Sequence, residues 1–204
     1  DKRPAAPRHQ LAGAERPAVS GGFTSTQQQM KIARPTLWEA PMIKGLHHNA
    51  YRCRDSEETR EFYEDFLGLR FVSAFEIDEG RSLHSFFEMD DGSCLAFFEV
   101  PGRPFDFKRQ DTLDLHIALG VEPDIFDRML DKARTEGIEV RGPVDHGFVR
   151  SIYMRDPNGY LVELTASTGV QQEIMDPAVS KPREALARWQ TAKTAGPSGR
   201  PSAA

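Results

Sequence analysis

Two histidines and two glutamates occupy matching places in the two halves of this sequence. His48 and His116 each lie in the first strand-like run of a half, and Glu99 and Glu163 each lie in the last. The separation from histidine to glutamate is 51 residues in the first half and 47 in the second. Imidazole nitrogens and carboxylate oxygens held on strands are suitable ligands for a divalent metal ion. The pattern therefore predicts a metal centre.

Two of these polar residues interrupt apolar runs. Glu163 stands inside "YLVEL" and His116 inside "LDLHIALGV". Burying a carboxylate or an imidazole without a partner is costly. Taken singly, each is more readily explained as an ordinary core or surface residue than as a metal ligand. Their joint placement in equivalent strands favours a cation that both of them bind.

The elements that carry these residues repeat along the chain. In the first half, residues 42–53 read as a strand, and Asp55 or Ser56 can cap a helix that ends at Gly68. Three strand-like runs follow at 69–77, 82–89 and 93–100, with the turn "DDG" between the last two. One face of the predicted helix is apolar and consists of Thr59, Phe62, Tyr63, Phe66 and Leu67.

The second half shows the same order. A strand is predicted over 113–121, then a helix that Pro123 opens and Gly137 closes, then strands over 138–142, 148–154 and 160–166. The apolar face of this helix consists of Ile125, Phe126, Met129, Leu130 and Ala133. We therefore predict an α+β fold in which two paired βαβββ modules form a cupped mixed sheet around a metal site.

The flanking segments have a different composition. Residues 1–40 are rich in Pro, Ala, Gly, Gln and Ser and are predicted to be a flexible arm, with Leu37 and Trp38 able to dock its end. The domain is predicted over 41–168, with modules at about 42–101 and 112–168. Residues 169–204 form an extension, with a helix at about 182–192 that carries Trp189 and a disordered tail from 193.

Composition excludes several classes of function. The net charge of −5 is unlike the basic footprint of a nucleic-acid-binding protein. No apolar run approaches the ~18 residues of a membrane span, and no export signal is visible. Cys53 and Cys94 do not make a disulfide framework. We expect a cytoplasmic protein with reduced thiols, a small-molecule substrate, and no nucleic-acid or membrane partner.

Over residues 42–167 the sequence resembles the vicinal oxygen chelate superfamily, which includes glyoxalase I, fosfomycin-resistance proteins, epimerases and type I extradiol dioxygenases. The motifs that carry the resemblance are "GLHHNAYRCRDSEETREFYEDFLGLRF", "DLHIALGV" and "YMRDPNGYLVEL". It implies that His48, His116 and Glu163 bind the metal. His47 is a rival to His48, but strand alternation puts the two on opposite faces. The seven-residue step to Asp55 favours His48.

One branch of the family is the extradiol dioxygenases, which use two histidines and one carboxylate to leave open positions on Fe(II). The run "VDHGFVRSIYMRDPNGYLVE" fits their signature, with His146 and Tyr153 in places that assist catalysis. These enzymes also carry an acid–base histidine near the end of the first module. Phe97 and Glu99 occupy that region here, so His84 is the intervening histidine that can substitute.

The other branch is glyoxalase I and the epimerases, which use a fourth ligand or a base at the end of the first module. Glu99 in "LAFFEV" matches that position, and Arg52 matches an arginine that glyoxalase I uses on its anionic thiol substrate. A site of two histidines and two glutamates would bind Ni, Zn or Co and move a proton next to a carbonyl.

These observations lead to a ranked prediction. An extradiol-type dioxygenase for a catecholic substrate comes first, with Fe(II) favoured and Mn, Ni, Zn or Co as alternatives. A glyoxalase- or epimerase-like enzyme that uses Glu99 comes second, and a small-molecule-binding resistance protein third. The catalytic candidates are His146, Tyr153 and Glu99, and the substrate-binding candidates are Arg52 and His84. A homodimer is possible, and the site either lies in one chain or is shared between two.

Overall fold

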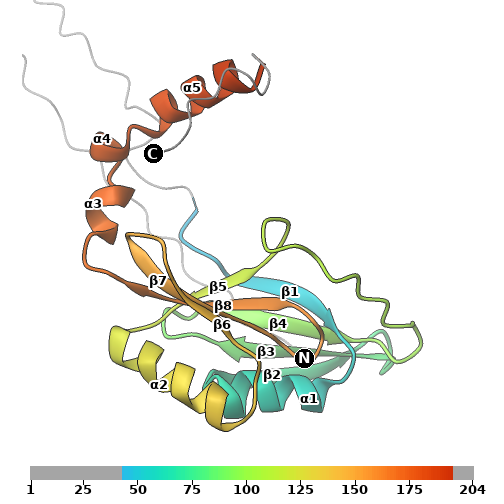
Figure 1. The fold of residues 1–204 in the computed structure, drawn as a ribbon. Coiled ribbons are helices and arrows are strands. Elements are labelled where there is room, and N and C mark those ends of the chain that lie inside the picture. Colours follow the sequence, from blue (N-terminus) through green and yellow to red (C-terminus); the bar gives the residue numbers. More distant parts are fainter. Residues whose placement is uncertain (1–42, 195–204) are drawn as a thin grey trace, which may run out of the picture. The chain divides into compact units, whose positions relative to one another are not determined.

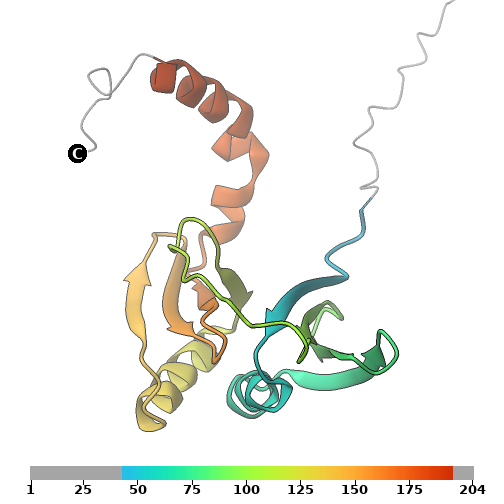
Figure 2. The same cartoon turned by 90° about the vertical axis from the view of Figure 1, so that its right-hand side faces the viewer.

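The structure, a computed structural model, describes residues 43–194. Every helix and strand in this range belongs to one unit that begins at Lys44. The predicted N-terminal arm, with Leu37 and Trp38, and residues 195–204 of the predicted tail lie outside the described residues. Figures 1 and 2 show the described elements from two directions.

The first module consists of one sheet and one bent helix. Its strands are hydrogen-bonded in the order β1-β4-β3-β2, with β1 and β4 parallel and the other pairs antiparallel. This is the topology of a βαβββ unit. The elements are β1 (His48–Cys53), α1 (Ser56–Arg60), a π-helical turn η1 (Glu61–Phe66), β2 (Arg70–Ile77), β3 (Ser82–Glu88) and β4 (Cys94–Glu99).

The helix begins and ends as the sequence predicts, but its second half is wider. The Asp55 carboxylate accepts from the backbone N–H groups of Glu57 and Glu58, and Gly68 ends the helix at φ 84°. Between them, the amide of Leu67 donates to the carbonyl of Phe62, five residues earlier. Such π turns are rare and leave no signature in a 3.6-residue periodicity, so the sequence predicted one regular helix.

The second module repeats the topology in the order β5-β8-β7-β6, with β5 and β8 parallel. Pro123 opens its helix as predicted, and the face with Phe126, Met129 and Leu130 is buried. A fully buried side chain such as Phe126 contributes about 1.5–3 kcal/mol to folding. The elements are β5 (Ile117–Gly120), α2 (Pro123–Thr135), β6 (Arg141–Asp145), β7 (Val149–Arg155) and β8 (Leu161–Ser167).

Two strands of the second module begin three or four residues later than predicted. The strand expected from residue 113 begins at Ile117, because the Asp111 side chain accepts from the amide of Leu113 and a turn follows it. Leu113 is 95% exposed, so the apolar residues that suggested a strand are not buried. The strand expected over 138–142 begins at Arg141 instead.

The modules pack through their helices and through a polar joint. The helices α1 and α2 lie side by side (Figures 1 and 2), and the Lys132 ammonium donates to the carbonyls of Asp65 and Phe66 at 2.8 Å. In the joint, the Tyr63 phenol donates to the Asp156 carboxylate at 3.1 Å, and both side chains are buried. Buried polar groups need such partners, so this bond fixes how the modules meet.

Three helices follow β8: α3 (Gln171–Met175), α4 (Pro177–Ser180) and α5 (Pro182–Thr194). The last extends into the predicted tail at Lys193 and Thr194, and the first two had no predicted counterpart. Trp189 is 53% exposed. Within residues 43–194, no helix has the length and apolar character that crossing a membrane requires. Cys53 and Cys94 are free thiols.

Candidate metal centre

His116 and Glu163 meet at the start of the parallel pair β5–β8. The Nε2 atom of His116 lies 3.3 Å from Oε2 of Glu163. Glu163 is 8% exposed, although it stands in a strand of apolar residues. Alternation along β8 and the β7–β8 register put Glu163 and Tyr153 in one row across the sheet. The two ligands predicted in the second module are therefore adjacent.

A backbone carbonyl determines that Nδ1 of the His116 ring carries a hydrogen. Its Nδ1 lies 2.8 Å from the carbonyl oxygen of Thr112, which can only accept, so Nδ1 carries the hydrogen. In the neutral form of the ring, the lone pair of Nε2 would therefore lie next to the carboxylate of Glu163. A backbone carbonyl on the far nitrogen is the usual support of a metal-binding imidazole. The donors present therefore fit a divalent cation between Nε2 and Oε2.

A hydrogen-bonded chain continues from Glu163 along the second sheet. The Tyr153 phenol donates to Oε1 of Glu163 at 3.2 Å, and Nε2 of His146 lies 2.9 Å from the same phenol oxygen. Because the phenol hydrogen points to Glu163, Nε2 of His146 is the donor to the phenol. Burial first, and then the charge of Glu163, raise the pKa of Tyr153. The phenol therefore stays protonated at neutral pH.

His48 lies on the other sheet, apart from this pair. It is the first residue of β1, and besides the adjacent His47 its aromatic neighbours are Phe86 and His84 on β3, with ring centroids 5.6 and 6.3 Å away. Nδ1 of His48 is 2.7 Å from Nδ1 of His47, which precedes the strand. In the part of the chain that the structure describes, no three His, Cys, Asp or Glu side chains are close enough to hold a metal.

The direction in which the first sheet faces explains this separation. We call the face that carries His48 the cup face of that sheet; by register and alternation it also carries Arg52, His84 and Phe98. The opposite face packs against α1 and the second module, where Tyr51 lies against Tyr160 with centroids 5.0 Å apart. One chain therefore brings together two of the three predicted ligands and holds the third on a face turned away from them.

Two substrate-binding candidates lie on the cup face with His48. The His84 ring is stacked on Phe98 with centroids 3.8 Å apart, and its Nδ1 is 3.1 Å from the carbonyl of Phe97. One guanidinium nitrogen of Arg52 donates to the carbonyl of Arg103, and its buried Nε has no hydrogen-bond partner among the described residues. His84, Arg52 and His48 thus share one face.

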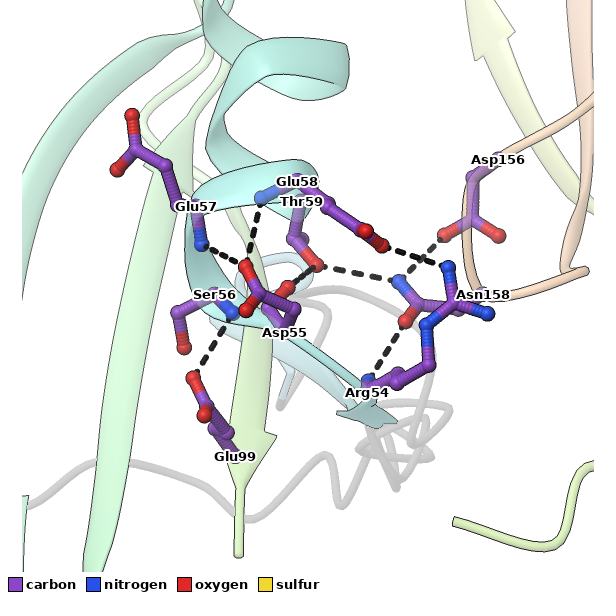
Figure 3. Close-up of polar contacts among 9 residues, drawn as sticks. All are labelled: Arg54, Asp55, Ser56, Glu57, Glu58, Thr59, Glu99, Asp156 and Asn158. Atoms are coloured by element: carbon purple, nitrogen blue, oxygen red, sulfur yellow. Dashed lines mark hydrogen bonds and ion pairs between the residues drawn. The ribbon is translucent and has the colours of Figure 1, made fainter. Parts of the chain in front are cut away.

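Glu99 does not lie on the cup face. It pairs with Cys53 in the β1–β4 register and lies on the face turned toward α1. Its carboxylate accepts from the backbone N–H of Ser56 at 2.8 Å, at the start of that helix (Figure 3). An acidic group there satisfies an otherwise unpaired helix donor. The assignment of Glu99 as a ligand or base of this site is therefore not supported by its position, because the strand backbone stands between it and His48.

The register of the two sheets identifies the true counterpart of Glu163. In the second module Glu163 pairs with Ala118, two residues after His116. In the first module the residue two after His48 is Ala50, and it pairs with Ala96. Ala96 is completely buried, and the symmetry-related position therefore carries no ligand. Matching the last strands of the two modules by their order alone had made Glu99 the counterpart of Glu163, and Glu99 is three residues after Ala96.

Two contributors to the site were not predicted from the sequence. One is the Thr112 carbonyl, since a backbone acceptor has no residue-type signature. The other is Arg141, whose guanidinium covers the Tyr153 ring at 4.3 Å from its centroid. The strand containing Arg141 was predicted, but the register that pairs it with Tyr153 includes an irregularity between Arg141 and Val144. A sequence pattern does not show such a shift.

Two known enzymes are similar to this chain in sequence. The chain is 31% identical to a lactoylglutathione lyase of Haemophilus influenzae over 120 residues, which are 57% of this chain and 87% of that protein. It is 51% identical to biphenyl-2,3-diol 1,2-dioxygenase 3 of Rhodococcus globerulus over 122 residues, which are 58% of this chain and 61% of that protein.

A solved structure has the same fold. The fosfomycin resistance protein FosX of Listeria monocytogenes, in a complex with Mn(II), superposes with a TM-score of 0.51 at 23% identity, covering 64% of this chain and 98% of that one. The profile of one family matches residues 45–164, which include both modules and both sheets. The chain therefore belongs to the Glyoxalase/Bleomycin resistance protein/Dioxygenase superfamily.

Proposed function

We propose that this protein is a divalent-metal-dependent dioxygenase of the extradiol type, which opens the ring of a catecholic substrate. The observation that carries the proposal is the ligand set, in which His48, His116 and Glu163 are available and the position equivalent to Glu163 is Ala96. Two histidines and one carboxylate leave open positions around the metal, as non-haem Fe(II) oxygenases require. A fourth protein ligand would occupy one of them.

Fe(II) is the metal that this ligand set favours, with Mn, Ni, Zn and Co as alternatives. When bound, it would offer coordination positions to two vicinal substrate oxygens and to O₂. The relative that is 51% identical is named for such a reaction on a biphenyl diol. It is the highest identity among the relatives described above and supports oxygenation over isomerisation.

The chain's own residues have distinct roles in this proposal. Tyr153 keeps its proton and presents it beside Glu163, where a substrate hydroxyl or oxygen can accept it. His146 orients the phenol by donating to it. On the cup face, Phe75, Phe86 and Phe98 surround His84 and provide flat apolar surfaces for an aromatic ring. The buried His84 can exchange a proton through Nε2, because Nδ1 is engaged at the Phe97 carbonyl.

We further propose that the site is completed between two copies of the chain. His48 lies on a face that its own His116 and Glu163 do not reach, so the cup face of one copy would have to cover the second sheet of its partner. One apolar residue of the cup face supports this, because Phe75 of β2 pairs with His84 and is 46% exposed. Burying it against a second copy would contribute to the stability of a symmetric dimer.

Complementation tests the shared site. The variants His48→Ala and Glu163→Gln are each expected to be inactive as homodimers. Mixed under conditions that exchange subunits, they would form heterodimers with one complete site, and activity would return to about a quarter of the wild-type value. If the complete site lay within one chain, no mixture would recover activity.

Oxygen consumption tests the reaction itself. Purified protein loaded anaerobically with Fe(II) is expected to take up one O₂ per catechol and to form a coloured ring-opened product. If the purified protein binds no stoichiometric divalent metal, this reaction is excluded. A small-molecule-binding protein of the bleomycin-resistance type would then be the better supported function.

A lyase acting on a glutathione thiol adduct is the second candidate. It is favoured by the lactoylglutathione lyases among the relatives and by the buried, unpartnered Nε of Arg52 on the cup face. Conversion of the hemithioacetal of methylglyoxal and glutathione, with Ni(II) or Zn(II) bound and without O₂ uptake, would establish it. The alanine at position 96 argues against it, since the proton-accepting carboxylate would be missing there.

A further inference from the structure

Three arginines converge on one cavity beside Tyr153. The cavity has a volume of about 510 Å³ and is lined by Arg109, Arg141 and Arg155 together with Tyr153. Tyr153 donates to Glu163, and Thr112, which also lines the cavity, accepts from His116. The cavity therefore lies next to the two ligands of the second module, since residues of its lining bond to both of them. Its volume is that of an ordinary small-molecule site.

Two of these arginines have no anionic partner. Among residues 43–194, the guanidinium of neither Arg109 nor Arg141 forms an ion pair or a hydrogen bond. Arg141 instead lies over the ring of Tyr153, and both are on the same row of the sheet as Glu163. A guanidinium placed in this way has its donors free at the rim of the site.

The third arginine is held rigidly next to the first. The Arg155 guanidinium donates to the carbonyls of Gly159 and Gln110 at 2.8 and 3.2 Å, which fixes its plane. Desolvation first, and then the positive charge of Arg109, lower the pKa of Arg155. An anion bound between the two would remove this repulsion, and guanidinium groups bind carboxylates in paired hydrogen bonds.

The charges of the cavity indicate how much negative charge it can take. Its lining includes two carboxylates, Asp111 and Glu139, and the Asp111 carboxylate already accepts from the amide of Leu113. Three positive and two negative groups leave an excess of one positive charge. A singly charged carboxylate matches this excess better than a doubly charged phosphate does.

We propose that the substrate of this site carries a carboxylate, which Arg109 and Arg141 bind in this cavity while the ring oxygens are placed beside Tyr153 and Glu163. This inference rests on the proposed function for the identity of the ring, and on the cavity alone for the anion. It narrows the substrate class from catechols in general to catechols with a carboxylate side chain.

The test compares an acid with its neutral form. The probes are a catechol that bears a propionate side chain and the methyl ester of the same compound, bound anaerobically to the Fe(II)-loaded protein in a calorimeter. Wild type is expected to bind the acid at least about tenfold more tightly than the ester, as a charge-assisted pair provides. Arg109→Gln and Arg141→Gln are each expected to reduce this preference toward one, and Arg109→Gln, which does not touch Tyr153, is expected to leave the affinity for the ester unchanged.

Two controls keep the result specific. Arg128→Gln removes an exposed arginine on α2 outside the cavity, where it lies 3.9 Å from Asp124, and is expected to retain the full preference. Arg109→Lys keeps the charge and is expected to retain part of it. Since Arg109 is exposed and has no described partner, its replacement leaves the fold intact, which a thermal melt verifies.

The failures of the two proposals are distinguishable. Equal affinity of wild type for acid and ester, or a preference that survives both Gln variants, overturns the carboxylate site even if the ester is oxidised. A phenylpropionate without hydroxyl groups tests the cavity on its own, with metal-free protein. If no catechol is oxidised but this probe binds in an Arg109- and Arg141-dependent manner, the anion site stands and the dioxygenase proposal falls.

Discussion

Ala96 holds in the first sheet the register position that Glu163 holds in the second. Each is paired with the residue two places after its module's histidine, Ala50 in one case and Ala118 in the other. The duplicated fold thus offers two equivalent places for a carboxylate and fills one of them. This asymmetry sets the number of protein ligands that the site can supply, and with it the number of open positions on a metal.

Replacing Glu99 by Gln tests whether this residue contributes to the site. We expect unchanged metal stoichiometry and turnover, because its carboxylate bonds to the Ser56 amide on the opposite face of the sheet (Figure 3). Stability should fall by about 0.5–1 kcal/mol, since the amide oxygen still accepts but the negative charge at the helix start is lost. Urea unfolding and metal analysis measure the two effects. Loss of the metal would show instead that Glu99 reaches it.

Replacing Tyr153 by Phe removes the hydroxyl between His146 and Glu163. We expect kcat to fall by about 10²–10³-fold, because the positioned proton donor is lost. The metal content should remain that of wild type, since His116 keeps its support from the Thr112 carbonyl. Tyr51→Phe is the matched control, because its hydroxyl accepts from Asn49 and bonds to neither His146 nor Glu163. Loss of metal from Tyr153→Phe would indicate a structural role instead.

Parts of this arrangement follow from the sequence, and parts do not. Period-two and period-3.6 patterns place Glu163 on a strand and Phe126 on a buried helix face, because burial alternates with those periods. They do not place Glu99, since a strand known by its order still has an unknown register, and a shift of one residue exchanges its faces. Nor do they show which surface of the first module meets the second. That depends on tertiary contacts such as Tyr63 with Asp156, 93 residues apart.

Replacing His84 by Phe separates its chemistry from its packing. The new ring can keep the stacking on Phe98, so we expect stability to fall by only about 1 kcal/mol for the lost hydrogen bond to the Phe97 carbonyl. If His84 exchanges a proton with the substrate, kcat falls by about 10²-fold or more while metal content is unchanged. A pH–rate profile that loses one limb in the variant would support this role. Wild-type kcat in His84→Phe would assign the residue to packing alone.

The buried carboxyl of Asp156 is expected to make stability depend on pH. Its oxygens accept from the Tyr63 phenol, the Asn158 amide and the Tyr160 backbone N–H. Burial nevertheless raises its pKa above the reference value of 3.8, because desolvation outweighs these bonds. The protonated form is favoured by folding, so this contribution is complete below pH 3.8 and is lost as the pH rises through the raised pKa.

Asp156→Asn tests the sign of this effect. The variant stays neutral at every pH but has one acceptor oxygen fewer, so it should be less stable than wild type by about 1–3 kcal/mol at acidic pH. Since only wild type loses stability as the carboxyl ionises, the difference should narrow as the pH rises from 4 toward neutrality. Urea unfolding at a series of pH values measures it, with Asp114→Asn, an exposed position in the turn before β5, as the control. A difference that widens with pH would mean that the three donors outweigh desolvation and that the ionised carboxylate holds the modules together.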